Sequence, residues 1–251
     1  MDDVILETRE LTREFRGFVA VKGVSLRVRR GTIHALIGPN GAGKTTVFNL
    51  LTRFLAPTRG RIFLAGREIT RAAPAEVARR KMVRSFQISA IFPSRTLLEN
   101  VRVALQRRHH GASFDFWRPA GALRRLDAEG KDLLAQVGLA GSADAVAGEL
   151  PYGQKRALEL ATTLALAPDV LLLDEPTAGM GHEDVGRISA LIARVARDRT
   201  VLMVEHNLKV VADLSHTITV LARGEILAEG DYAAVSRNPD VVSAYMGSGG
   251  A

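Results

Sequence analysis

The stretch that decides the fold reads Gly38-Pro39-Asn40-Gly41-Ala42-Gly43-Lys44-Thr45, and Thr46 completes the residues predicted to bind nucleotide. It fits the pattern GxxxxGK[ST] at every fixed position. Glycines let the backbone curl so that several amide N–H groups face one cluster of phosphate oxygens, and a following helix adds its positive N-terminus. Lys44 would reach the β- and γ-phosphates, and the Thr45 hydroxyl would ligate Mg²⁺. The stretch therefore predicts a nucleoside triphosphate site.

The residues on either side of this stretch provide the context that such a loop requires. The mostly apolar run Ile33–Ile37 predicts a buried strand before the loop. From Lys44 onward the spacing is helical, with Val47, Leu50, Leu51 and Phe54 on one face. A chance match to the pattern in a chain of this composition has a probability of about 1%. Strand, glycine-rich turn and helix together favour a phosphate-binding loop over an ordinary turn.

A pair of carboxylates follows another apolar run. Residues 170–173 are Val-Leu-Leu-Leu, and Asp174 and Glu175 come directly after them. Ligands bind at the carboxyl ends of parallel strands, so both carboxylates are predicted to face the phosphates. We expect Asp174 to orient the magnesium shell and Glu175 to polarise the attacking water as general base.

Two further polar residues are weaker candidates when each is taken alone. His206 follows the apolar run 201–204 and could donate a hydrogen bond to a γ-phosphate. A helix cap or an ordinary surface histidine is the alternative reading. Gln87, in Ser85-Phe86-Gln87, carries less information still on its own.

Bulk composition limits the remaining possibilities. The chain has 251 residues, 47% of them hydrophobic, with no cysteine and a formal net charge of +7. We find no run of 18 apolar residues and no secretion signal at the acidic start, so we expect a protein that stays in the cytoplasm. The basic residues are scattered, which favours a solvated surface and predicts no nucleic-acid partner.

The order of predicted elements indicates one α/β domain with an insertion. The first forty residues are rich in short strands, residues 88–166 are mostly helical, and strands and helices alternate afterwards. Thr96 and Glu99 form a capping-box pattern at the start of one of the helices. We therefore expect a mainly parallel sheet built from 1–87 and 167–251, with 88–166 as a helical subdomain.

The motifs taken together resemble an ATP-binding cassette (ABC) transporter ATPase over essentially the whole chain. The matching segments, in family order, are Gly38 to Thr45, Gln87, Leu150-Pro151-Tyr152-Gly153-Gln154, Leu172 to Thr177 and His206. The resemblance implies a P-loop NTPase core with an N-terminal antiparallel β region and an inserted helical subdomain. It also implies ATP and Mg²⁺ as ligands.

The resemblance assigns roles to residues that chemistry alone leaves open. Phe15 falls where the family stacks an aromatic ring on adenine. Gln87 belongs to the loop that contacts magnesium and links it to the membrane partner. Residues 150–154 form the signature that caps the γ-phosphate bound by the opposite subunit, so that ATP lies between two cassettes. His206 takes the position of the γ-phosphate sensor.

The chain departs from the family pattern at two places. The commonest signature is Leu-Ser-Gly-Gly-Gln, but Pro151 and Tyr152 stand at its second and third positions, so no serine hydroxyl is available there. Gly153 still permits a close approach of backbone. Gly181 stands where the family usually has a polar side chain that crosses the dimer interface. Contacts between the two ATP sites are therefore expected to be weaker or made by backbone.

The variant signature, with residues 83–87 and the tail 238–247, looks like the ATPases of branched-chain amino-acid importers. The resemblance implies a second ATPase subunit (the same chain or a related one), membrane permease subunits and, indirectly, an extracytoplasmic substrate-binding protein. It implies a peripheral place at the cytoplasmic face of the membrane. The alternatives are urea or amide import, lipopolysaccharide-type export and, less favoured, an ABC ATPase without a transport role.

Overall fold

The computed structural model describes residues 3–85, 91–110 and 126–246, and the predicted loop residue Gln87 lies outside them. The chain separates into two compact units, which we call the core unit and the helical unit. The core unit comprises Met1–Arg84, Asp169–Ala178 and Ile192–Ala251, and the helical unit comprises Ser85–Pro168 and Gly179–Leu191. The predicted division at 87/88 and 166/167 stays a prediction.

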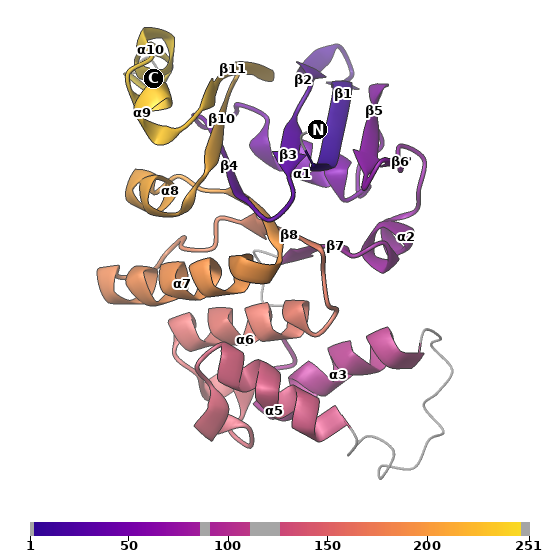
Figure 1. Cartoon of the computed structure of the whole chain (residues 1–251), viewed down its shortest axis with the longest axis vertical. Helices are drawn as coiled ribbons and strands as arrows, with labels where there is room; N and C mark the ends of the chain where they lie inside the picture. The colour runs from indigo at the N-terminus through magenta and orange to yellow at the C-terminus, as the bar shows by residue number, and fades with distance from the viewer. Residues whose placement is uncertain (1–2, 86–90, 111–125, 247–251) are drawn as a thin grey trace. The chain divides into compact units, whose positions relative to one another are not determined.

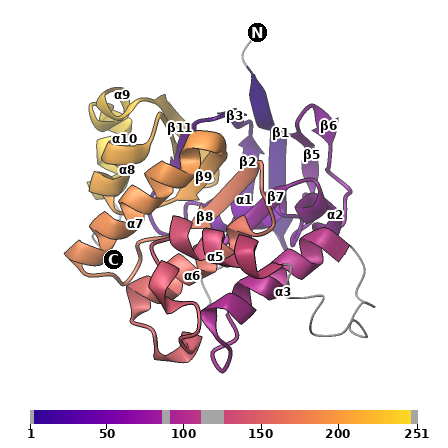
Figure 2. The same ribbon diagram turned by 60° about the horizontal axis from the view of Figure 1, so that its bottom comes forward.

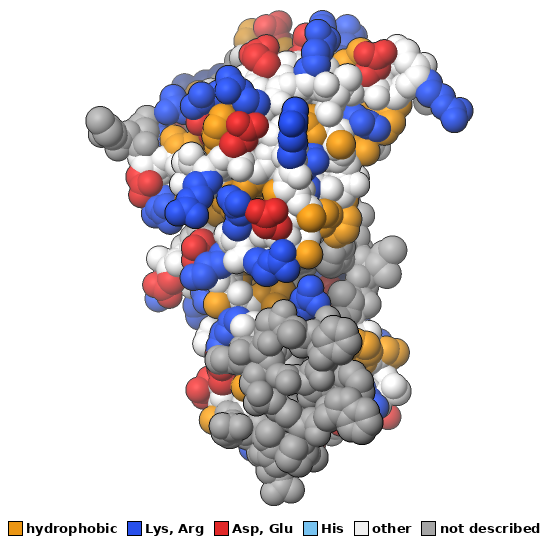
Figure 3. All heavy atoms as spheres, turned by 90° about the vertical axis from the view of Figure 1, so that its right-hand side faces the viewer, with side chains coloured by type: hydrophobic (Ala, Val, Ile, Leu, Met, Phe, Trp, Pro, Cys, Tyr) orange, Lys and Arg blue, Asp and Glu red, His pale blue; other side chains and the backbone are white. Residues whose placement is uncertain are grey.

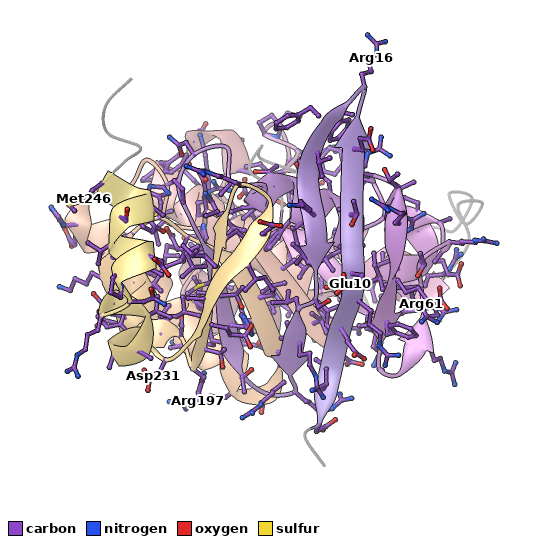
Figure 4. The ribbon with its side chains drawn as sticks, turned by 90° about the horizontal axis from the view of Figure 1, so that it is seen from above. Glu10, Arg16, Arg61, Arg197, Asp231 and Met246 are labelled. Atoms are coloured by element: carbon purple, nitrogen blue, oxygen red, sulfur yellow. The ribbon has the colours of Figure 1, made fainter. Side chains whose placement is uncertain are left out.

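An antiparallel sheet forms the N-terminal part of the core unit, as the sequence predicts (Figure 1). Its strands are β1 (Val4–Phe15), β2 (Phe18–Val24), β5 (Arg59–Leu64) and β6 (Arg67–Glu68), in the order β2-β1-β5-β6, and β3 (Arg27–Arg29) also pairs with β1. Arg16 and Gly17 form the β1–β2 turn with positive φ, and Figure 4 shows Arg16 at its tip, pointing outward.

The second sheet is mainly parallel and carries the strands expected around the phosphate loop. Its order is β11-β10-β4-β9-β8-β7. The strands are β4 (Ile33–Ile37), β7 (Met82–Ser85), β8 (Val170–Asp174), β9 (Thr200–Val204), β10 (Thr217–Ala222) and β11 (Glu225–Gly230). Strands β10, β4, β9 and β8 are parallel neighbours, and β11 returns antiparallel to β10. Every residue of β4, β8 and β9 is buried, which explains their near-continuous apolar sequence.

Helix α1 (Lys44–Leu51) follows the glycine-rich loop, and its apolar face lies in the main core. Val47, Leu50 and Leu51 are fully buried, as predicted. The sequence prediction extended this face to Phe54, which is wrong: the helix ends at Leu51, and Phe54 lies beyond it with 60% of its surface exposed. Arg53 has φ 63°, a left-handed conformation that ends the helix before Phe54 is reached.

The other helices of the core unit are short, apart from one that both units share. They are α2 (Pro74–Arg79), η5 (Ala196–Asp198), α8 (Leu208–Leu214), α9 (Tyr232–Ser236) and α10 (Pro239–Met246). Helix α7 (His182–Val195) has its first ten residues in the helical unit and its last four in the core unit. Figure 4 shows Met246 at the end of α10.

The helical unit is built from α3 (Leu97–His110), α5 (Asp127–Gln136) and α6 (Tyr152–Leu164), with short 3-10 turns η3 (Ala140–Ser142) and η4 (Ala147–Glu149). Figure 2 shows α3, α5 and α6 packed together. The predicted capping box is confirmed: the Thr96 amide donates to Glu99 Oε2 (2.9 Å), and the Glu99 amide donates to Thr96 Oγ1 (3.2 Å).

The charged side chains are dispersed over the surface. Figure 3 shows Lys and Arg side chains spread over one face with Asp and Glu between them. Many of the arginines have local acidic partners, such as Arg80 with Glu76 and Arg9 with Glu7. Among the residues that the structure describes, no helix has both the length and the apolar character needed to cross a bilayer.

Candidate nucleotide-binding site

The loop from Gly38 to Thr45 is held by backbone from other strands. Gly38 has φ 150°, and a Cβ there would lie 2.1 Å from the carbonyl oxygen of Leu221 in β10. Gly43 has φ 103°, and a Cβ there would lie 2.6 Å from the carbonyl oxygen of Ala20 in β2. Only glycine fits these two positions, which gives a structural reason for two of the fixed positions of the motif.

Lys44 folds back over this loop. Its Nζ donates to the carbonyl oxygens of Gly38 (2.6 Å) and Pro39 (2.9 Å). Burial lowers the pKa of the Lys44 ammonium, and the Glu175 and Asp174 carboxylates act in the opposite direction. The lysine and both carboxylates are therefore close enough to interact electrostatically. Lys44 lies at the phosphate loop, whereas Asp174 and Glu175 lie at the end of β8.

Asp174 closes strand β8 and is 4% exposed. Its Oδ2 accepts a short hydrogen bond from Arg84, whose side chain is 10% exposed. The other terminal nitrogen of the Arg84 guanidinium, Nη1, donates to Asn49 Oδ1 on α1 (2.7 Å). A buried carboxylate needs such a partner, because an unpaired charge at this depth is strongly unfavourable. Arg84 therefore joins the helix after the phosphate loop to the strand that carries the predicted metal ligand.

Glu175 adopts a left-handed backbone conformation with φ 47°. This conformation is uncommon for residues other than glycine, and strained residues of this kind cluster at functional sites. The Glu175 amide donates to the carbonyl oxygen of Val204 at the end of β9 (2.9 Å), which holds the turn in place. The conformation turns the chain sharply as it leaves β8, so Asp174 is buried while Glu175 is half-buried.

His206 lies just beyond the end of β9, and its side chain is 61% exposed. The residue before it, Glu205, is 1% exposed and accepts hydrogen bonds from the amides of His206 (2.8 Å) and Asn207 (3.0 Å). Asn207 caps α8 by accepting from the Lys209 amide (3.1 Å). The helix-cap alternative for His206 is therefore wrong, because Asn207 is the cap. Glu205 therefore holds the backbone of His206 in place, while the imidazole stays exposed.

Phe15 ends β1 and is 40% exposed. A ring that stacks on adenine needs an exposed face of this kind. The guanidinium of Arg13 lies 4.6 Å from the centre of its ring. Arg13 is itself fixed, because it donates to the carbonyl oxygen of Ala56 (2.8 Å). One face of Phe15 is thus occupied by a cation–π contact, and only the other face remains for a stacking partner.

The signature residues lie in the helical unit at the start of α6. Pro151 is the N-cap and Tyr152 the first helical residue, so the proline stands where it removes no helical hydrogen bond. Leu150 is buried, whereas Pro151, Tyr152 and Gln154 are exposed. The Arg156 guanidinium lies 5.7 Å from the centre of the Tyr152 ring. Gly181, the second departure from the family pattern, is exposed and sits just before α7.

A cavity of about 650 Å³ lies against the phosphate loop. Residues Pro39 to Ala42 line one side, and the β10–β11 turn and α10 line the others. The hydroxyl of Tyr245 on α10 hydrogen-bonds with the backbone of Gly38, while burial raises the pKa of this tyrosine. The C-terminal helix thus contacts the first glycine of the loop.

Sequence reasoning missed several residues that the structure places at this site. They are Arg13, Asn49, Arg84, Glu205 and Tyr245. Glu205 could have been found, because a carboxylate directly after a buried parallel strand is the signal that identified Asp174. The others carry no such signal, since each is recognised only by the partner that the fold brings to it.

Two known families match parts of this chain. The family described as ABC transporter matches residues 21–178, which include the phosphate loop, the signature and the end of β8. The family described as branched-chain amino acid ATP-binding cassette transporter matches residues 225–251, which include α9 and α10.

Relatives that match nearly the whole chain belong to the same family. A high-affinity branched-chain amino acid transport ATP-binding protein, BraF, from Pseudomonas aeruginosa is 42% identical over 98% of this chain and 99% of its own. LivG from Escherichia coli, named for the same role, is 36% identical with the same coverage. A crystal structure of the ADP conformation of an ABC transporter cassette matches with a TM-score of 0.84, 29% identity, and 97% and 99% coverage of the two chains. The chain therefore belongs to the ABC transporter family, as one of its ATP-binding, ATP-hydrolysing subunits.

Proposed function

We propose that this chain powers an importer of branched-chain or other hydrophobic amino acids by binding and hydrolysing ATP. The observation that carries the proposal is the match of residues 225–251 to the branched-chain family, because this segment lies outside the general ABC transporter match. The names of the relatives with 36–42% identity over 98% of the chain support it. They do not favour urea or amide import, lipopolysaccharide-type export, or a role outside transport.

The phosphate loop supplies the binding energy for the triphosphate. The loop amides and the N-terminus of α1 face the phosphates, with no acidic residue in the first turn of that helix to repel them. Lys44 would exchange its two carbonyl partners for β- and γ-phosphate oxygens, which compensates its partial burial with opposite charge. Phe15 would stack on adenine with the ring face that Arg13 leaves open.

The residues present fit a magnesium ion. The Thr45 hydroxyl, exposed at the second residue of α1, and the Asp174 carboxylate are oxygen donors of the kind that Mg²⁺ prefers. The contact of Asp174 with Arg84 uses Oδ2. Among the described residues no hydrogen bond to Oδ1 is seen, so Oδ1 and any water that it orders would serve the metal shell. Bound there, Mg²⁺ would neutralise charge on the β- and γ-phosphates. Gln87 would belong to the same shell by the family resemblance.

Glu175 would act as general base and His206 as the γ-phosphate sensor. Glu175 is half-buried just beyond Asp174, where a carboxylate can accept a proton from water that attacks the γ-phosphate. The exposed imidazole of His206 can donate a hydrogen bond to the same phosphate and hold the water in line.

The remaining partners complete the ATP site and receive its energy. Residues 150–154 would cap the γ-phosphate bound by a second ATPase subunit, with the Gly153 backbone taking the place of the missing serine hydroxyl. The pair, of one chain or two related ones, would act on membrane permease subunits from the cytoplasmic face. An extracytoplasmic binding protein would deliver the amino acid. Closure on ATP and reopening after hydrolysis would form the cycle.

The test of the catalytic assignment is Glu175→Gln. This variant should bind ATP with unchanged affinity and lose at least about a hundredfold in turnover, since the amide cannot accept the proton. Glu183→Gln is the matched control, because Glu183 is an exposed glutamate near the start of α7 with a surface arginine partner. Undiminished hydrolysis by Glu175→Gln would show that another group is the base.

The test of the cargo uses the ATPase with its permease subunits and binding protein in proteoliposomes. Leucine, isoleucine or valine should stimulate ATP hydrolysis and accumulate inside, whereas urea should do neither. Stimulation by urea alone would assign the chain to an amide-type importer. Failure to sediment with membranes that contain the permease would contradict the transport role itself.

A further inference from the structure

We propose that Glu205 is a positioning residue that joins the turn carrying the general base to the turn carrying the γ-phosphate sensor, so that the two keep a fixed spacing. The proposal rests on the proposed function for the roles of Glu175 and His206. It adds a residue to which neither the motifs nor the resemblance assigns a role.

The two oxygens of Glu205 face different segments. Oε1 accepts from the Thr177 amide (3.1 Å) and, in a short hydrogen bond, from the Thr177 hydroxyl. Oε2 accepts from the amides of His206 (2.8 Å) and Asn207 (3.0 Å). Thr177 comes two residues after Glu175, so a single carboxylate joins the segment after β8 to the segment after β9.

Glu205 fits this role because of its chemistry as well as its place. An ionised carboxylate only accepts hydrogen bonds and can take about four of them, and here four donors converge on it. Its 1% exposure means that water does not compete with these donors. Hydroxyl and backbone N–H groups donate to this carboxylate, and His206 Nδ1 lies 3.9 Å from its Oε2. Hydrogen bonds to a charged acceptor are about twice as strong as neutral ones.

The surrounding bonds extend this connection to both elements. The Glu175 amide donates to the Val204 carbonyl (2.9 Å), so the two segments are also joined at the base itself. Asn207 Oδ1 accepts from the amides of Lys209 (3.1 Å) and Val210 (3.3 Å), which fixes the start of α8. A displacement of His206 therefore moves the segment at Thr177 with it, and the sensor and the base respond together.

The decisive variant is Glu205→Gln, which keeps the shape of the side chain and changes its polarity. If the NH₂ group faces the amides of His206 and Asn207, both of those hydrogen bonds are lost. If it faces Thr177, the bond from the Thr177 amide is lost, although the Thr177 hydroxyl can rotate to accept from the NH₂ group. Either orientation weakens the connection between the two segments. We expect kcat to fall about 10- to 100-fold, the loss typical of a small misplacement of reacting groups. The dissociation constant of a fluorescent ATP analogue should stay within about twofold of the wild-type value.

The matched control is Glu159→Gln. Glu159 is also a buried glutamate (5% exposed), but it pairs with Arg156 within the helical unit. A loss that reflects only the removal of a buried carboxylate would appear equally in this variant. The double variant Glu205→Gln/His206→Ala provides a second control. If Glu205 acts through the position of His206, the double variant should lose no more turnover than His206→Ala alone.

Thr177→Val tests the proposal if Glu205→Gln does not fold. It removes the hydroxyl donor alone and should lower kcat about threefold without changing nucleotide affinity. Wild-type kcat in Glu205→Gln, or in Thr177→Val where the first variant is unfolded, would overturn the inference. A parallel loss of kcat and nucleotide affinity, matched by Glu159→Gln, would also overturn it. An inactive wild-type chain in the same assay would instead contradict the proposed function.

Discussion

Two glycine-containing loops precede helices in this protein, and they are constrained in different ways. In the core unit, Gly38 and Gly43 of the phosphate loop lie against carbonyl oxygens of β10 and β2, at distances that exclude a Cβ. In the helical unit, the atoms nearest to a Cβ on Gly153 of the signature would be those of the Asp184 carboxylate, at 2.8 Å. A backbone carbonyl in a sheet cannot move aside, whereas the end of an aspartate side chain can rotate away.

This difference explains why one motif is complete and the other is altered. The phosphate loop satisfies its pattern at every fixed position because the fold itself excludes alternatives there. At the signature, Pro151 and Tyr152 replace the usual residues and remain exposed, so the fold of this chain places little restriction on them.

The largest effect that this comparison predicts is that of Gly38→Ala. The new Cβ would lie 2.1 Å from the Leu221 carbonyl oxygen, at a φ of 150° that L residues rarely adopt. Overpacking and backbone strain together should lower the free energy of unfolding by about 4 kcal/mol or more. Urea denaturation followed by circular dichroism measures this loss directly.

Gly41→Ala is the control within the same loop. Gly41 also has a positive φ (76°), but a Cβ there would meet nothing within 4 Å. Its cost should be the left-handed strain alone, about 1 kcal/mol. Equal losses in the two variants would show that conformational strain, and not crowding by β10, sets the requirement for glycine.

Acidification should weaken the framework that holds the phosphate loop. His34 of β4 is buried, and its Nε2 lies 2.7 Å from the hydroxyl of Thr219, which donates to Glu229 (2.6 Å). The threonine proton is thus used, so the Nε2–H of a neutral imidazole is the donor. Burial lowers the pKa of His34 to about 4.

The sign of the pH effect follows from this pKa. Between about pH 6.5 and pH 4 the unfolded chain binds a proton that the folded protein does not, so stability falls as the pH falls. We expect a loss of about 1 kcal/mol between pH 7 and pH 5.5. Urea denaturation at the two pH values measures it, with His34→Gln as the control that should lack this contribution. An equal slope in the variant would assign the effect to other groups.

The sequence predicted most of the fold, and it named candidate site residues whose roles stay predictions. Loops such as 38–45 and strand ends such as Asp174–Glu175 combine a local pattern with a chemical requirement, so they can be recognised without the structure. Arg84 and Tyr245 could not be found in this way, because their significance comes from Asp174 and Gly38, which are distant in sequence. The missed end of α1 before Phe54 has a similar cause, since helical spacing alone does not reveal the left-handed residue that ends the helix.

The smallest effect on stability is expected from Gly153→Ala, and it separates stability from function. Gly153 lies in the first turn of α6, where alanine favours the helix by about 0.5–1 kcal/mol, and this offsets the displacement of the Asp184 carboxylate. The free energy of unfolding should therefore change by less than about 1 kcal/mol. Under the proposed function, the added methyl group obstructs the backbone approach to the opposite γ-phosphate, so turnover should fall about tenfold. A large loss of stability in urea denaturation would mean that the signature loop, like the phosphate loop, is fixed by its own fold.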